Sequence, residues 1–134
     1  MATTPLKFKT PECASRFLHV HPTLIAIICD MALWALSQNV PFVVTDSVST
    51  LQEDLELKRV STSHRECRAA DISIRGWTDD VMKRFKEHFE KKYPDVGAIS
   101  QSGIRNLVVI HDNGNGLHIH TQLAKTFAME FKGV

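Results

Sequence analysis

The chain has 134 residues, of which 43% are hydrophobic and 23% charged, the proportions of one globular domain spanning residues 1–134. Its formal net charge of +1 gives no electrostatic reason to expect a nucleic-acid partner. The longest apolar stretch, Leu24 to Leu36, is interrupted by Asp30 and is too short to cross a bilayer, so we expect no membrane insertion.

The N-terminal residues predict no targeting signal and little regular structure. Lys7 and Lys9 are not followed by an apolar run, so we expect no secretory signal and synthesis in the cytoplasm. The three cysteines, an odd number without C-x-x-C spacing, fit a reducing compartment rather than a disulfide framework. Because Pro5 and Pro11 disfavour a helix, residues 1–18 are predicted to be an irregular lead-in.

The first half of the chain predicts a buried helix followed by a strand. Residues 22–37 begin with a proline, which suits a first helical turn, and are apolar most of the way round, as in a core helix. Residues 41–45 predict a strand and residues 51–57 a short helix. His19 and His21 form an H-x-H pair at the entrance of the first helix. No carboxylate lies nearby at the spacing of a metal site, so both are expected to be structural or exposed.

The middle of the chain predicts a loop, a strand and a second helix. Residues 60–70 form the loop and lead into residues 71–75, where polar and apolar side chains alternate as in a strand. This alternation puts Asp71 on the polar face. Thr78 is a good N-cap for a helix that ends near Lys92 and buries one apolar stripe.

The last third predicts a β-hairpin. A loop at 93–103 is followed by an apolar strand at 105–111, a strong turn signal at 113–116 and a returning strand at 117–123. Residues 124–131 are expected to form a short closing helix. Together these elements predict an α+β fold, an antiparallel sheet of about four strands with helices packed on one face.

Two short motifs carry the residue types of a metal site. His64 precedes Asp71 by seven positions, and His118 and His120 stand at i and i+2 of a predicted strand, so both leave the same face. Two histidines and one aspartate are ligands that a catalytic zinc uses, with a fourth position open for water. Each histidine taken alone is more often structural, so a chance association is the alternative.

The order and spacing of these residues resemble a known family of zinc peptidases. The pattern His64-x-x-Cys67-x-Ala69-x-Asp71 is similar to the H-x-x-G-x-A-x-D motif of the D-alanyl-D-alanine carboxypeptidase family, which includes phage endolysin L-alanyl-D-glutamate peptidases. The late H-x-H pair resembles the second zinc motif of the wider group that contains lysostaphin-type endopeptidases and the hedgehog signalling domain. The resemblance covers roughly residues 24–123.

This resemblance implies a site and an activity. His64, Asp71 and His120 would hold one zinc ion on the open face of the sheet, and His118 would be catalytic. The implied function is that of a hydrolase, a zinc metallopeptidase that cleaves a peptide bond in the peptidoglycan stem or cross-link by metal-activated water. Its partner would be a peptidoglycan peptide, and it would act on the cell wall as phage endolysins do.

Departures from the family pattern separate the alternatives. Cys67 replaces the usual Gly, and the Glu common before the last ligand in the carboxypeptidases is missing. Ser49 stands where the family has a substrate-binding Arg, which favours endopeptidase over carboxypeptidase action. Arg59, Arg75 and His111 are candidate substrate contacts. The alternative function is a catalytically inactive, peptidase-like domain that binds a metal or a peptide, and a structural protein without a metal is the third.

Overall fold

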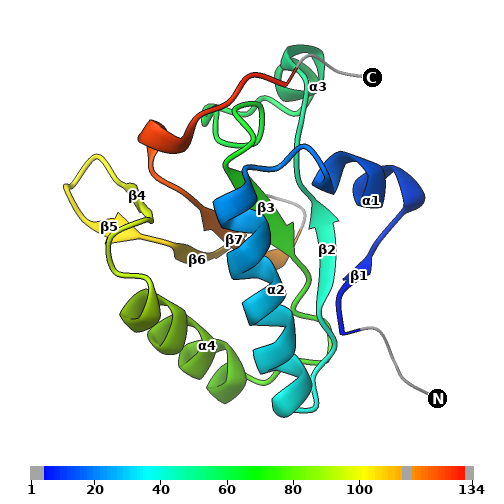
Figure 1. Cartoon of the computed structure of the whole chain (residues 1–134), viewed down its shortest axis with the longest axis vertical. Helices are drawn as coiled ribbons and strands as arrows, with labels where there is room; N and C mark the ends of the chain where they lie inside the picture. Colours follow the sequence, from blue (N-terminus) through cyan, green and yellow to red (C-terminus); the bar gives the residue numbers. More distant parts are fainter. Residues whose placement is uncertain (1–4, 113–115, 132–134) are drawn as a thin grey trace.

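The centre of the fold is a mixed five-stranded sheet with the strand order β1-β2-β3-β7-β6 (Figure 1). The computed structural model describes residues 5–112 and 116–131. Strands β2, β3, β7 and β6 are antiparallel, which confirms the predicted sheet, and β1 adds a fifth strand parallel to β2. The strands are β1 (Lys7–Phe8), β2 (Val43–Asp46), β3 (Ala69–Ile72), β6 (Val108–Asp112) and β7 (Leu117–Gln122).

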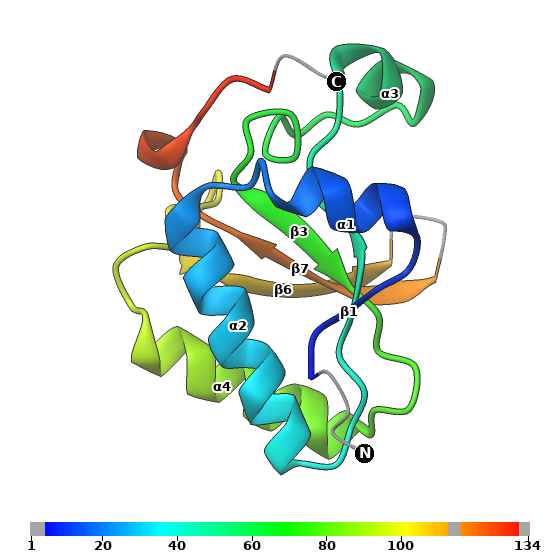
Figure 2. The same ribbon diagram turned by 45° about the vertical axis from the view of Figure 1, so that its right-hand side comes forward.

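Helices cover one face of this sheet (Figure 2). They are α1 (Pro11–Phe17), α2 (Pro22–Ser37) and α4 (Asp79–Lys92), and a short α3 (Leu51–Glu56) follows β2. The bounds of α2 agree with the prediction, and Thr78 caps α4 as expected, since its side chain accepts a hydrogen bond from the N–H of the third helical residue. No helix among the described residues is long and apolar enough to span a membrane.

The predicted irregular lead-in at residues 1–18 is wrong, because its described part contains β1 and α1. Pro11 lies in the first turn of α1, where a missing backbone N–H breaks no helical hydrogen bond, and Thr10 caps the helix by accepting from the N–H of Cys13. Cys13 and Phe17 are buried in the core. Tertiary packing therefore stabilises a helix that is too short to form alone.

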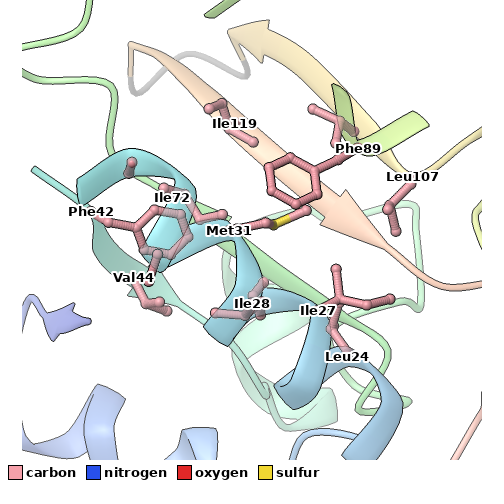
Figure 3. Close-up of a cluster of buried hydrophobic side chains, with 14 of the residues drawn as sticks. Leu24, Ile27, Ile28, Met31, Phe42, Val44, Ile72, Phe89, Leu107 and Ile119 are labelled. Carbon is pink, nitrogen blue, oxygen red and sulfur yellow. The ribbon is translucent and has the colours of Figure 1, made fainter. Parts of the chain in front are cut away.

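The hydrophobic core lies between the helices and the covered face of the sheet (Figure 3). Val44, Ile72 and Ile119 contribute to it from β2, β3 and β7, and each is 0% exposed. Side chains alternate along a strand, so the neighbours of these three residues face the uncovered side of the sheet. The helices contribute mainly Leu24, Ile27, Ile28 and Met31 of α2 and Phe85 and Phe89 of α4.

The region around the hairpin has more strand structure than predicted. β4 (Ala98–Ile99), inside the expected loop, pairs antiparallel with β5 (Arg105–Asn106), so the strand expected at 105–111 is divided between β5 and β6. Residues 113–115 of the predicted turn lie outside the described residues. The closing helix is a single 3-10 turn, Lys125–Phe127.

Helix α4 is bonded to the outer edge of the sheet where β6 begins. The carboxylate of Glu90 accepts hydrogen bonds from the backbone N–H groups of Leu107, at 2.8 Å, and Val108, at 3.2 Å. The ammonium group of Lys86 donates to the carbonyl of Val108 and also pairs with Glu90. Two side chains of a helix thus take the place of a neighbouring strand at this end of β6.

Candidate metal centre

The candidate site lies on the uncovered face of the sheet, where β3 and β7 are neighbours. Asp71 of β3 is directly opposite His120 of β7, in the same register that puts Ile72 opposite Ile119. Because Ile72 and Ile119 are buried in the core, the alternation turns Asp71 and His120 to the other side. Nδ1 of His120 lies 2.9 Å from Oδ1 of Asp71. β3 ends before the predicted strand 71–75 does, but Asp71 keeps the orientation expected for it.

His64 reaches the same point from the turn that precedes β3. Its backbone carbonyl accepts hydrogen bonds from the N–H groups of Cys67, at 3.2 Å, and Ser49, at 3.4 Å, which hold the turn. Cys67 has a φ of +61°, a left-handed conformation that glycine adopts at the least cost, so the turn has the shape that a glycine at this position would favour. Nε2 of His64 lies 3.3 Å from Oδ1 of Asp71.

The three predicted ligands therefore come together. One donor atom each from His64, Asp71 and His120 lies within 4.8 Å of the other two. The three residues are 4%, 7% and 8% exposed, so their donor atoms are largely shielded from water. Three donor atoms that each bind one ion at about 2 Å would lie slightly closer to one another than this limit. A group of this composition and spacing could bind a metal ion.

Hydrogen bonds on the far side of each imidazole determine which ring nitrogen faces Asp71. Nδ1 of His64 lies 2.5 Å from the carbonyl oxygen of Ser47, which can only accept, so Nδ1 carries the proton. Nε2 of His120 likewise donates to Oε1 of Gln122, at 3.0 Å. Each ring then presents a lone pair to the Asp71 carboxylate. Three electron-rich atoms at one point require a cation or an added proton between them, and this donor set fits a metal ion.

The electrostatics of the site also favour positive charge at this point. Burial raises the pKa of Asp71, but when the facing nitrogens of His120 and His64 carry a proton, their hydrogen bonds to Asp71 and their positive charges outweigh burial and hold that pKa well below its usual range. For His64, burial lowers the pKa, whereas the hydrogen bond and charge of Asp71 act in the opposite direction and raise it overall. Asp71 is therefore an anion near neutral pH and the natural partner of a cation.

His118 and His111 line the site beside the three candidate ligands. Nδ1 of His118 lies 3.1 Å from the carbonyl oxygen of Gly116, which can only accept, so in the neutral ring the lone pair is on Nε2, 3.9 Å from Oδ1 of Asp71. His111 of β6 is opposite His118, and their ring centres are 4.6 Å apart. Both Nε2 atoms are buried and find no hydrogen-bond partner in the described part of the chain. Burial lowers the pKa of His111, and positive charge on His118 or His120 would lower it further when either ring is protonated.

Two adjoining cavities meet at the site. The larger, of about 990 Å³, extends over β2 and the beginning of β7, and the smaller, of about 400 Å³, lies over β6 and β7. Both cavities are lined by Leu57, Arg59, Asp71 and His118. Asp71 and His118 therefore line both cavities.

The two predicted substrate-binding arginines are in different situations. The guanidinium group of Arg59 bonds to the carboxylate of Asp46 and lies 3.3 Å from that of Asp54, so its charge is already matched inside the protein. Arg75 lies in the turn after β3, is exposed, and lines the larger cavity. Of the two, Arg75 is the one whose charge faces the cavity without such a partner among the described residues.

Three contributors to the site were not found from the sequence. Gln122 has a detectable signal, because it shares the polar face of its strand with the H-x-H pair. Ser47 contributes a backbone carbonyl, which no residue type reveals. Lys9 lines the larger cavity but belongs to the segment that was predicted to be irregular.

The other H-x-H pair has the structural role that was expected. Nδ1 of His21 accepts a hydrogen bond from the N–H of Thr23 at 3.0 Å and so caps α2. The ring of His19 packs against that of Phe131, with their centres 5.3 Å apart. Neither belongs to the group of candidate ligands.

Comparisons with known proteins identify no relative of this chain. No family model matches it, and it has no match among curated proteins or solved structures.

Proposed function

We propose that this protein is a zinc-dependent peptidase that hydrolyses a peptide bond in the peptidoglycan stem or cross-link. The observation that carries the proposal is the convergence of His64, Asp71 and His120 within 4.8 Å, in the order and spacing of two zinc motifs. Two imidazoles and a carboxylate are ligands of catalytic zinc, with a fourth position left for water or substrate. The lone pairs that both imidazoles present to Asp71 support the same conclusion.

His118 has the properties of the group that moves the proton. When bound, zinc would lower the pKa of a bound water towards about 7 and polarise the scissile carbonyl. In the neutral ring, Nε2 of His118 can accept the proton that the water loses as its oxygen attacks the carbonyl carbon. His118 can then deliver this proton to the amide nitrogen as the C–N bond breaks. The products are a carboxylic acid and an amine.

The shape of the site supports endopeptidase over carboxypeptidase action. The two cavities that meet at His118 offer room for substrate residues on both sides of the scissile bond. In the carboxypeptidases that the motifs resemble, an arginine is the natural partner of the terminal carboxylate. Here Ser49 stands at that position, is buried and donates to Asp54 at 2.5 Å, so a terminal carboxylate has no partner at this position.

The replacement of the family's arginine by Ser49 also favours the second candidate, a peptidase-like domain that binds a metal or a peptide without turnover. The arginine that helps the family bind substrate is missing, and Arg59, whose side chain lines both cavities, is held by two carboxylates. Zinc content does not separate the two candidates. Turnover does.

Metal analysis and peptidoglycan digestion together test the proposal. Protein purified without chelator should contain about one zinc per chain, and digestion of purified peptidoglycan should release peptide fragments that mass analysis identifies. His118→Ala is the negative control for turnover, and His88→Ala, on the exposed side of α4, is the matched control. Zinc without turnover would favour the binding domain. Protein that neither contains nor binds zinc would refute the peptidase.

A further inference from the structure

The larger cavity has positive charge that the proposed chemistry does not use. Its charged lining residues are Lys9, Arg59, Arg75, Asp46 and Asp71. Arg59 is paired with Asp46, and the carboxylate of Asp71 is occupied by two histidines. Lys9 and Arg75 are both exposed, and neither forms an ion pair with another described residue. The cavity therefore has two cations available to a ligand on the same side of the sheet as the metal centre.

The backbone that carries Arg75 is held in place although its side chain is free. The N–H of Arg75 donates to Oγ of Ser73 at 3.1 Å. The next residue, Gly76, has a φ of +85°, and a Cβ added there would lie 3.2 Å from the ring of Pro41. Nε1 of Trp77 then donates to the carbonyl of Pro41 at 2.7 Å, which ties the turn to the segment before β2. The guanidinium group is thus presented from a rigid turn.

The backbone of Lys9 is also held in place, at the end of the β1–β2 pair. Its N–H donates to the carbonyl of Val44 at 2.9 Å, so Lys9 extends the pairing of β1 with β2 by one residue. The ring of Phe8 packs against that of Phe17, with the centres 5.1 Å apart, which anchors β1 to α1. Residues 43 and 45 of β2, on either side of the buried Val44, line the same cavity.

We propose that Lys9 and Arg75 form a carboxylate-binding subsite, and that the substrate is therefore a peptide with a free carboxylate close to the scissile bond. This inference rests on the proposed peptidase function. A guanidinium group can bind a carboxylate through two parallel N–H donors, and an ammonium group adds a point charge. Because Asp71 and His118 line the same cavity, a carboxylate bound there belongs to the part of the substrate that adjoins the cleaved bond.

The test compares two forms of the same ligand. Purified peptidoglycan fragments with free stem-peptide carboxylates are set against the same fragments after amidation of these carboxylates. The variants are Arg75→Gln and Lys9→Gln, alone and combined. Lys83→Gln, exposed on α4 in the layer that covers the other face of the sheet, is the control with the same change of charge. Hydrolysis gives kcat and KM, and calorimetry gives Kd whether or not the fragments are cleaved.

We expect Arg75→Gln to raise KM and Kd for the free-carboxylate fragments by about 10- to 100-fold with little change in kcat, because hydrogen bonds to charged groups contribute on this scale. For the amidated fragments, the same variant should change KM and Kd by less than about threefold. Lys83→Gln should behave as the wild type, and zinc content should be unchanged in every variant. A loss that is equal for both forms, or equal in the Lys83 control, would overturn the subsite.

The outcomes separate this inference from the function on which it rests. If the wild type binds the free-carboxylate fragments more tightly but cleaves neither form, the subsite stands and the peptidase proposal fails. If the wild type cleaves both forms equally and the variants match it, the peptidase stands and the subsite fails.

Discussion

Asp71 and His120 are 49 positions apart in the chain, yet they face each other across two adjacent antiparallel strands with Nδ1 of His120 2.9 Å from Oδ1 of Asp71. The register of β3 and β7 is what brings them together. A shift of one residue would turn one of them towards the core, so the pairing that buries Ile72 and Ile119 also assembles the candidate metal centre.

His120→Ala is expected to remove the metal. The change leaves two of the three protein ligands, so the zinc content of the purified protein should fall from about one equivalent to nearly none, and activity should be lost with it. Metal binding is coupled to folding, so the melting temperature should also fall in zinc-containing buffer. Elemental analysis and thermal denaturation measure both effects, with His88→Ala as the matched control. A variant that keeps its zinc would exclude His120 as a ligand.

His118→Ala is expected to separate turnover from metal binding. If Nε2 of His118 moves the proton, its loss should lower kcat by roughly 10²- to 10⁴-fold. Zinc content and melting temperature should remain close to those of the wild type, because His118 is not one of the three converging donors. Loss of zinc from this variant, with zinc retained by His120→Ala, would reverse the two roles.

Gln122→Ala is expected to weaken the metal site although Gln122 is not itself a candidate ligand. Oε1 of Gln122 accepts the hydrogen bond from Nε2 of His120 that leaves Nδ1 free to bind a metal. Loss of such a supporting contact lowers metal affinity by about 10- to 100-fold. Competition with a chelator of known affinity measures this change, and Gln52→Ala, exposed on α3, is the control. Unchanged affinity would show that the tautomer of His120 does not depend on Gln122.

Asp30→Asn is expected to reduce the dependence of stability on pH. Asp30 of α2 accepts a hydrogen bond from the hydroxyl of Tyr93 at 2.6 Å and pairs with Lys92 at 2.6 Å. Burial raises the pKa of Asp30, but these contacts outweigh it and lower that pKa overall, while the pKa of Tyr93 rises to about 12, chiefly through burial and then through Asp30.

The folded pKa of Asp30 therefore lies below its unfolded value, which is about 3.9 for an aspartate side chain. The stabilisation is present above that value and is lost as the pH falls through the folded pKa. Urea denaturation from pH 7 to pH 3 should show the wild type more stable than Asp30→Asn at neutral pH and the difference shrinking below about pH 4. A difference that is constant across this range would contradict the assignment.

The elements with strong local signals could be predicted from the sequence. Helix α2 has a proline in its first turn and an apolar surface, and α4 has Thr78 as its cap and one apolar stripe. The alternation along β7 puts His118 and His120 on one face, as expected, because Ile119 between them must be buried. The same alternation applies to Asp71 beside Ile72.

The features that depend on tertiary packing could not be predicted. Helix α1 has seven residues and β1 has two, so neither has a pattern long enough to recognise, and both are stabilised by contacts with the sheet and core. The approach of His111 to His118 depends on the hairpin register, which the sequence specifies only through its turn. The pairing of Arg59 with Asp46 depends on how the segment after α3 folds back.

The contacts of Glu90 and Lys86 with β6 have a consequence for how the protein behaves at high concentration. An unprotected edge strand offers free N–H and C=O groups to another copy of the chain and is a starting point for aggregation. At Val108, both backbone groups are taken by side chains of α4. This end of the sheet is therefore closed to strand addition, and removing the carboxylate of Glu90 would open it to self-association.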